Sequence, residues 1–170
     1  SKMGVVLLKT AELIKDYDDN ARFFMPFINL NHREIIRGHE NYSWVNFSEG
    51  NSQEVLAASH IGIVTSGTAS LEAALLRTPV VVAYKTSWLT YSLVKPLLKI
   101  NHFALPNLLS EEVVLPELIQ KEVTATNLFE AYKDLEGNNY HKSLEAFEKI
   151  HSKLMANGPD TAAKVIAEML

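Results

Sequence analysis

Residues 60–84, HIGIVTSGTASLEAALLRTPVVVAY, contain two strand-like runs with a helix-like run between them. The two outer runs, 60–65 and 79–84, are apolar and rich in β-branched residues. Alanine and leucine dominate the inner run, which begins after the small polar turn Ser66-Gly67-Thr68. A strand, a helix and a strand joined by such short connections predict a βαβ unit with parallel strands.

The alternation of strand-like and helix-like runs continues on both sides of this unit. On the amino-terminal side we predict a helix over 1–17, a strand over 21–29, a helix over 30–40, a strand over 42–47 and a helix over 51–59. On the other side we predict a helix over 87–100, which Pro96 should interrupt, and a short strand over 102–105. In a βα repeat a first helix normally follows a first strand, so the helix over 1–17 indicates a segment of a longer chain.

From Pro116 onward the sequence shows only helical patterns, with helix ends predicted at Gly137 and Gly158. We therefore predict an α/β fold, a Rossmann-like parallel sheet with helices on both faces and an α-helical C-terminal extension. Residues 1–115 are expected to form the Rossmann-like part, and residues 116–170 the helical extension of the same domain.

Composition excludes several classes of function. The chain has 170 residues, a net charge of −4 and no cysteine, so disulfides, thiolate metal sites and cysteine nucleophiles are excluded. The negative charge argues against a nucleic-acid binder and against a polybasic membrane tether. No apolar run reaches the roughly 20 residues of a membrane-spanning helix. We expect a soluble cytoplasmic protein.

The polar turns after the predicted strands are the candidate ligand sites, because open parallel sheets bind ligands at the carboxyl ends of their strands. Three such turns occur, at 66–68, at 84–87 and at Pro106-Asn107. In the first, Gly67 permits close approach of a ligand, and the amino end of the following helix suits a phosphate. Ser66 and Thr68 add hydroxyl groups.

Glu72 lies about one turn inside the helix that follows this turn. A carboxylate is a poor partner for phosphate but a good acceptor for the hydroxyl groups of a ribose. The residues also fit ordinary turn and capping chemistry, in which an acid early in a helix favours the dipole. The local sequence leaves both interpretations open.

Other motifs point to no further chemistry. The six histidines show no metal-ligand spacing, so we expect no metal and no cofactor. The sequence has no GxSxG elbow, Walker A motif or GxGxxG motif. The segment 87–100 mixes aromatic and aliphatic residues with Lys95 and Lys99, which fits core packing or, alternatively, a membrane-surface patch.

Three motifs in order resemble the lipid-A-disaccharide synthase family of GT-B glycosyltransferases. They are SGTASLEAALLRTPVVVAYK at 66–85, LPNLL at 105–109 and PELIQ at 116–120. The resemblance covers about two-thirds of the chain and implies one half of a GT-B fold, the half that holds the nucleotide-sugar donor. Another GT-B or UDP-sugar epimerase domain, or a non-catalytic dimerising α/β domain, is the alternative.

The resemblance implies a hexosyltransferase of lipid A and lipopolysaccharide biosynthesis in a Gram-negative bacterium. Its members transfer 2,3-diacylglucosamine from UDP to 2,3-diacylglucosamine 1-phosphate (lipid X), forming the lipid A disaccharide and UDP. The resemblance places the diphosphate on Ser66, Gly67 and Thr68 and the ribose on Glu72. Three more residues are implied to line the donor cleft, namely Asn107, Glu117 and Gln120.

The resemblance also implies parts that this sequence lacks. A phosphate loop after the domain's first strand would precede Ser1, and the acceptor-binding half with its carboxylate base would lie further upstream. Ser110-Glu111-Glu112 replaces the Ala-Gly and basic residue usual after PNLL. The chain alone is expected to bind nucleotide without turnover. A homodimer through the helical tail and peripheral contact with the cytoplasmic face of the inner membrane are also implied.

Overall fold

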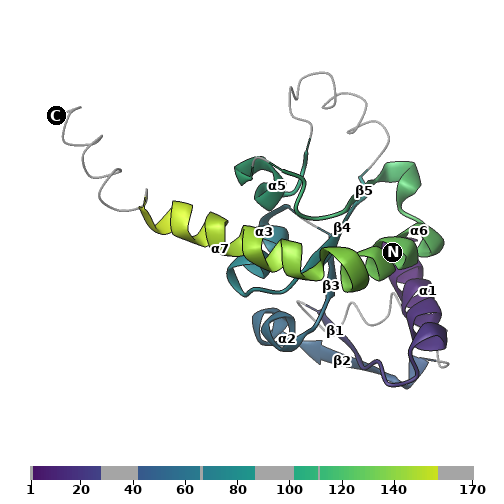
Figure 1. The fold of residues 1–170 in the computed structure, drawn as a ribbon. Helices are drawn as coiled ribbons and strands as arrows, with labels where there is room; N and C mark the ends of the chain where they lie inside the picture. The colour runs from purple at the N-terminus through teal and green to yellow at the C-terminus, as the bar shows by residue number, and fades with distance from the viewer. Residues whose placement is uncertain (1, 28–41, 66, 87–101, 111, 157–170) are drawn as a thin grey trace.

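The computed structural model describes residues 2–27, 42–65, 67–86, 102–110 and 112–156, and its elements alternate as expected for an α/β fold (Figure 1). The first half contains α1 (Lys2–Tyr17), β1 (Phe23–Phe27), β2 (Val45–Glu49), α2 (Ser52–Ala58), β3 (Gly62–Val64), α3 (Gly67–Leu75) and β4 (Val80–Tyr84). The second half contains α5 (Leu105–Leu109), β5 (Glu117–Ile119), the 3₁₀ turn η3 (Gln120–Glu122), α6 (Ala125–Asp134), the π-helical turn η4 (Leu135–Asn139) and α7 (Tyr140–Ala156). The predicted helices over 30–40 and 87–100, with Pro96, and the predicted helix end at Gly158 lie outside the described residues.

In the described ranges the strands form two parallel sheets. In one sheet β1 pairs with β2, with Phe23 opposite Val45 and Phe27 opposite Glu49. In the other the order is β3-β4-β5, with Gly62 opposite Val80. Every pairing is parallel, which confirms the predicted parallel α/β architecture.

Strand β4 is buried on both faces. Val80 and Val82 pack against α3 and against Phe147 and Ile150 of α7. Val81 and Ala83 point the opposite way, because side chains alternate along a strand, and they pack against Leu128 and other residues of α1 and α6. Helices therefore cover both faces of this sheet, as the alternation of strands and helices predicts.

The prediction of a strand over 102–105 is wrong. Residues 102–104 form no strand, and Leu105 begins the short helix α5. Pro106 occupies the first turn of this helix, where its missing N–H costs nothing. Burial of Pro106 and Asn107 fixes the segment as a packed helical turn.

The prediction of helices only after Pro116 is also wrong at its start. Glu117–Ile119 form β5, which pairs with β4 in the register Val82–Glu117 to Tyr84–Ile119. Val82 donates its N–H to the Pro116 carbonyl at 2.9 Å, so pairing with the edge of β4 overrides the local helical pattern. The division into 1–115 and 116–170 remains a prediction.

Gly137 does not end a helix, contrary to prediction. It lies inside η4, a π-helical turn that connects α6 directly to α7. The backbone of the turn therefore continues from one helix into the next, and Leu135 of the turn is fully buried. Packing of that leucine holds the junction despite the glycine.

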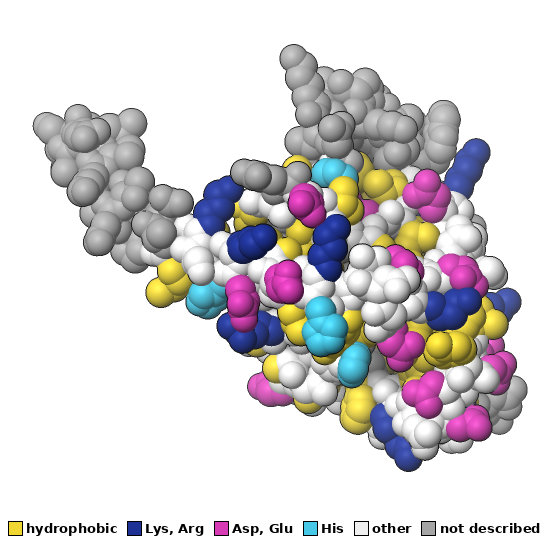
Figure 2. Space-filling view, viewed as in Figure 1, with side chains coloured by type: hydrophobic (Ala, Val, Ile, Leu, Met, Phe, Trp, Pro, Cys, Tyr) yellow, Lys and Arg dark blue, Asp and Glu magenta, His cyan; other side chains and the backbone are white. Residues whose placement is uncertain are grey.

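The face of the molecule seen in Figure 2 carries a mixture of basic and acidic side chains. Arg77 lies 3.2 Å from Glu148, and Lys142 lies 3.4 Å from Glu112, both pairs being exposed. Among the helices in the described ranges, none is long and apolar enough to cross a membrane.

Replacement of Leu128 by alanine tests the core on the α1–α6 side of β4. Leu128 is fully buried, so its truncation is expected to lower the free energy of unfolding by about 2–5 kcal/mol. Leu108→Ala is the matched control, because Leu108 is 43% exposed and its truncation should cost less than about 0.5 kcal/mol. Urea denaturation followed by circular dichroism measures both, and equal costs would contradict this packing.

Candidate functional site

The carboxyl ends of β3, β4 and β5 lie at one edge of their sheet, because the three strands are parallel neighbours. Thr65 follows β3, Lys85 and Thr86 follow β4, and Gln120 follows β5. The side-chain oxygen of Gln120 accepts the Thr86 N–H at 3.3 Å, which ties the ends of two strands together. Three of the sequence-predicted site residues, Gly67, Thr68 and Gln120, lie just after the carboxyl ends of β3 and β5.

Gly67 begins α3 and lies against the backbone of Phe103. A Cβ at Gly67 would come within 2.7 Å of the Phe103 carbonyl oxygen, closer than real Cβ contacts allow. The Ser70 hydroxyl donates to the Gly67 carbonyl at 2.6 Å and fixes the first turn of the helix. Thr68 is exposed beside it, and Ser66 lies outside the described residues. The glycine is needed for this backbone approach, whatever ligand the turn binds.

Asn107 is 4% exposed and uses all of its hydrogen-bonding capacity within the protein. Its amide oxygen accepts the N–H groups of Val114 and Leu115 at 2.8 and 2.9 Å. Its amide nitrogen donates to the Leu115 carbonyl at 2.9 Å and to Glu117 Oε1 at 2.6 Å. In this arrangement Asn107 braces the segment before β5 and has no polar position free for a ligand.

The Glu117 carboxylate, 8% exposed, is surrounded by protein donors. Oε1 accepts from Asn107, and His102 Nδ1 lies 3.3 Å from the same oxygen. Oε2 accepts the Phe103 N–H at 2.7 Å. Glu117 thus holds residues 102–103 in place, and Phe103 is the residue whose carbonyl approaches Gly67.

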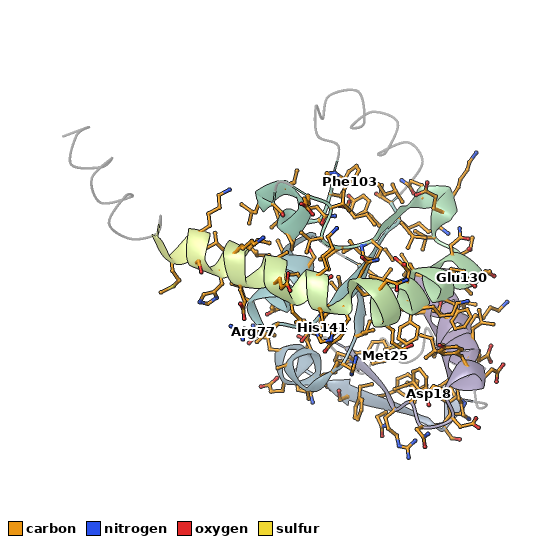
Figure 3. All side chains as sticks on the ribbon, viewed as in Figure 1. Asp18, Met25, Arg77, Phe103, Glu130 and His141 are labelled. Atoms are coloured by element: carbon orange, nitrogen blue, oxygen red, sulfur yellow. The ribbon has the colours of Figure 1, made fainter. Side chains whose placement is uncertain are left out.

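His102 and Phe103 complete this cluster, and sequence analysis did not identify either of them. The Phe103 ring stacks on Tyr84 at the end of β4, with centroids 5.3 Å apart and planes 17° apart. Figure 3 shows Phe103 near α5, far from Met25 of β1. The signal for them in the sequence is the position of His102-Phe103 directly before the LPNLL motif, in the stretch 102–105 for which the sequence predicts a strand.

Gln120 combines two unusual features. Its backbone φ is 53°, in the left-handed region that residues other than glycine rarely adopt. Its side-chain nitrogen is buried and has no hydrogen-bond partner among the residues that the structure describes. Strained backbone and an unsatisfied buried donor both cost free energy, and such costs concentrate at binding sites.

Glu72 lies in a different neighbourhood from the Asn107–Glu117 pair. Its Oε1 accepts a hydrogen bond from Gln53 of α2, and its side chain lines a cavity between the two sheets. Within the described residues its Oε2 makes no hydrogen bond, so it remains an available acceptor.

The segment after α5 is held at the surface. Glu112 donates its N–H to the Ser110 hydroxyl at 3.4 Å and pairs with Lys142 of α7. Glu111 lies outside the described residues. Across the described part of the chain, no group of three acidic, histidine or cysteine side chains is placed to hold a metal ion.

Comparison with known proteins finds a matching family and similar proteins whose names agree with it. Residues 1–166 match the sequence model of the family described as lipid-A-disaccharide synthetase. The lipid-A-disaccharide synthase of Idiomarina loihiensis is 32% identical over 100% of this chain and 46% of its own length. That of Haemophilus influenzae (strain 86-028NP) is 36% identical, with 96% of this chain and 44% of the relative covered. That of Xylella fastidiosa is 34% identical, with 100% and 46% covered. The chain spans about half the length of these curated relatives.

Asn107→Ala tests whether this residue is a structural brace. The substitution leaves the buried N–H groups of Val114 and Leu115 without an acceptor, so we expect a loss of about 3 kcal/mol or more in unfolding free energy. Asn46→Ala is the control, because Asn46 is exposed and its side chain donates to the Phe23 carbonyl at the surface. If urea denaturation gives the same loss of unfolding free energy for both variants, Asn107 is not a structural brace.

Gly67→Ala tests the backbone contact with Phe103. The added methyl group meets a carbonyl oxygen rather than a flexible side chain, so we expect a fall in melting temperature. Gly4→Ala is the matched control, since no atom lies within 4 Å of a Cβ at that helical position and alanine should stabilise α1 by about 0.5–1 kcal/mol. A melting temperature for Gly67→Ala at or above that of the unmodified chain would exclude the close contact.

Proposed function

The chain belongs to the lipid-A-disaccharide synthetase family, and from this premise we propose that it is the donor-binding half of a glycosyltransferase that makes the lipid A disaccharide. The donor is UDP-2,3-diacylglucosamine, the acceptor is 2,3-diacylglucosamine 1-phosphate, and the second product is UDP. The observation that carries the proposal is the family match over residues 1–166 of a chain whose candidate site lies at the carboxyl edge of a parallel sheet.

We assign the diphosphate of the donor to the amino end of α3. Helix amino ends bind phosphate because their free N–H groups and the helix dipole favour negative charge. Gly67 exposes backbone there, and the hydroxyl of Thr68 lies beside it on the surface. As the glycosidic bond to UDP breaks, negative charge grows on the diphosphate, and fixed donors at this position lower the barrier.

We assign the ribose of the donor to Glu72. The ribose hydroxyls are donors, and the carboxylate offers Oε2 as a free acceptor while Gln53 holds Oε1. The hydrogen bond from Gln53 restricts the side chain to one orientation before the ligand arrives, which reduces the entropy lost on binding.

For the remaining three residues the geometry favours different roles. Gln120 is assigned to donor contact, because its side-chain nitrogen is a buried donor without a partner. Asn107 and Glu117 act through the backbone, since they hold residues 102–103 and 114–115 at the edge of the site. Their carboxamide and carboxylate position the site instead of contacting the sugar.

We further propose that the catalytic base and the acceptor site belong to the other half of the longer protein, so that this chain binds donor without turnover. A homodimer through the helical tail is consistent with exposed apolar residues on α7, where Met155 is 71% exposed. Peripheral contact with the cytoplasmic face of the inner membrane would bring the acylated substrates to the enzyme.

UDP binding tests the donor assignment. UDP at millimolar concentration is expected to raise the melting temperature, because a ligand that binds only the folded state stabilises it. Glu72→Ala should abolish the shift, whereas Glu54→Ala, at an exposed position of the neighbouring α2, should leave it unchanged.

The Gln53→Ala variant separates the two interpretations of Glu72. If Glu72 binds the ribose, the loss of Gln53 weakens UDP binding only partly, because the carboxylate remains. If Glu72 acts only through its contact with Gln53, Gln53→Ala and Glu72→Ala change the UDP-induced shift in melting temperature equally. Absence of any shift with UDP in the unmodified chain argues against the donor assignment.

A further inference from the structure

His102 is a titratable side chain at the candidate site to which the proposed function gives no role. Its Nδ1 lies 3.3 Å from Glu117 Oε1. The side chain of His102 is 34% exposed, whereas that of Glu117 is 8% exposed. Among the residues that the structure describes, no group pairs with the second ring nitrogen, Nε2. One nitrogen of the ring is therefore held by the protein, and the other is available to a ligand.

The carboxylate that holds the ring is itself fixed. Asn107 donates to its Oε1 at 2.6 Å, and the Phe103 N–H donates to its Oε2 at 2.7 Å. The two nitrogens of an imidazole lie on different sides of the ring. Because Nδ1 faces a buried carboxylate, Nε2 is turned toward the exposed side. A carboxylate on one nitrogen sets the orientation and the proton position of a histidine in the same way in other proteins.

The backbone places this ring beside the amino end of α3. His102 directly precedes Phe103, whose carbonyl oxygen lies 2.7 Å from the position of a Cβ on Gly67. The proposed function assigns the diphosphate of the donor to the free N–H groups at that helix end. Gln120, at the end of β5, has a buried side-chain nitrogen without a partner among the described residues. His102 thus belongs to an edge that already has donors to offer.

Glu117 is the charged group that faces His102 within the described part of the chain. The neighbouring helix α5 (LPNLL) contains no charged residue, and residues 67–71 of α3 (GTASL) contain none. At the end of β4, Tyr84 stacks on Phe103, and Lys85 after it is exposed. An anion that reaches the exposed side of the ring therefore meets no described carboxylate at α5 or at the first residues of α3.

We propose that His102 binds the diphosphate of the UDP donor through Nε2, with Glu117 on Nδ1. The ring donates from both nitrogens when it is protonated, and an anion on each side favours that form. Binding of the diphosphate is therefore coupled to uptake of a proton by the ring. No covalent bond to His102 forms or breaks. The inference rests on the proposed function and adds a chain-specific cation to its diphosphate site.

The same contact acts during glycosyl transfer. Negative charge grows on the diphosphate as its bond to the sugar breaks, and a fixed cation at that place lowers the barrier. Glu117 keeps the ring in place before the donor arrives, so less rotational freedom is lost on binding. Glu117 is thus a positioning residue, and His102 is the residue that touches the ligand.

His102→Asn separates the ligand contact from the structural one. An asparagine amide offers an N–H near the position of Nδ1 and nothing near the position of Nε2. In the longer protein that contains this chain, the variant is expected to keep its melting temperature and to bind UDP about tenfold or more weakly. Isothermal titration calorimetry measures the affinity.

Proton uptake gives a readout that a structural role would not change. At about pH 8 the terminal phosphate of UDP is already ionised. Titration of UDP in two buffers of different ionisation enthalpy then reports the protons taken up by the protein. We expect the unmodified protein to take up a fraction of a proton and His102→Asn to take up none, because histidine is the side chain that changes charge near neutral pH.

His102→Gln is the conservative variant. Its longer amide carries a neutral N–H near the position of Nε2. It is expected to recover part of the affinity that His102→Asn loses, without recovering the proton uptake.

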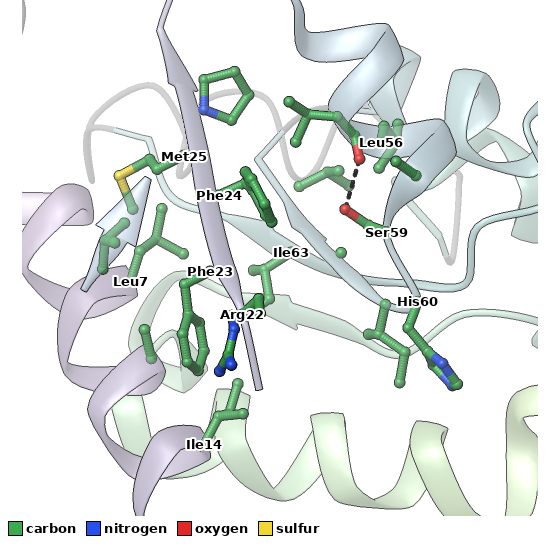
Figure 4. Close-up of a pocket in the computed structure, with 18 of the residues that line it drawn as sticks. Leu7, Ile14, Arg22, Phe23, Phe24, Met25, Leu56, Ser59, His60 and Ile63 are labelled. Atoms are coloured by element: carbon green, nitrogen blue, oxygen red, sulfur yellow. Dashed lines mark hydrogen bonds between the residues drawn. The ribbon is translucent and has the colours of Figure 1, made fainter. Parts of the chain in front are cut away.

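His141→Asn is the matched control, because His141 is exposed at the other end of the strands. Its ring packs on Tyr140, which in turn packs on His60 with centroids 4.5 Å apart. Figure 4 shows His60, just before β3, and Arg22, just before β1, at one end of the cavity that these strands border. Figure 3 shows His141 on α7 and Phe103 near α5. The control should change neither UDP affinity nor proton uptake.

The outcomes distinguish this inference from the proposed function. Equal proton uptake by the unmodified protein and His102→Asn would overturn the role of His102 and leave the donor assignment intact. A loss of affinity for a UDP-sugar without any loss for UDP would also overturn it, since the ring would then contact the sugar. If the unmodified protein binds no UDP, the donor assignment is wrong and the role of His102 is wrong with it.

Discussion

The structure depends on the burial of β4 on both of its faces. Its alternating side chains contact α3 and α7 on one side and α1 and α6 on the other, while β3 and β5 occupy its two edges. This arrangement satisfies the backbone of β4 and removes its side chains from water at the same time. It also fixes the edge at which the ends of three strands, and hence the candidate site, come together.

The site itself depends on a second constraint, the close approach of residues 102–103 to the amino end of α3. Glu117 accepts the Phe103 N–H, Asn107 donates to Glu117, and Gly67 leaves room for the Phe103 carbonyl. Asn107 is buried, the Glu117 side chain is 8% exposed, and most of the hydrogen-bonding capacity of both is used within the protein. We propose that they frame a donor site, in which the α3 turn, Glu72 and Gln120 contact the ligand.

The sequence predicted the parallel fold because its strongest signals, such as the apolar run at 79–84, report burial directly. The predictions of a strand over 102–105 and of a helix over 117–119 are wrong, because these short segments take their structure from tertiary partners. The pairing of β5 depends on the free edge of β4, which no local pattern reveals. For the same reason the roles of Asn107 and Glu117 as braces, and the contribution of His102 and Phe103, could not be predicted from motifs alone.

We propose that this chain holds the nucleotide of a UDP-sugar at the carboxyl edge of its sheet. A crystal structure of the longer protein with UDP tests it most directly. We expect the diphosphate within hydrogen-bond distance of the Gly67 N–H and the ribose on Glu72, with Glu117 still bound to Phe103. UDP bound away from the amino end of α3, or a ribose that does not touch Glu72, would contradict it.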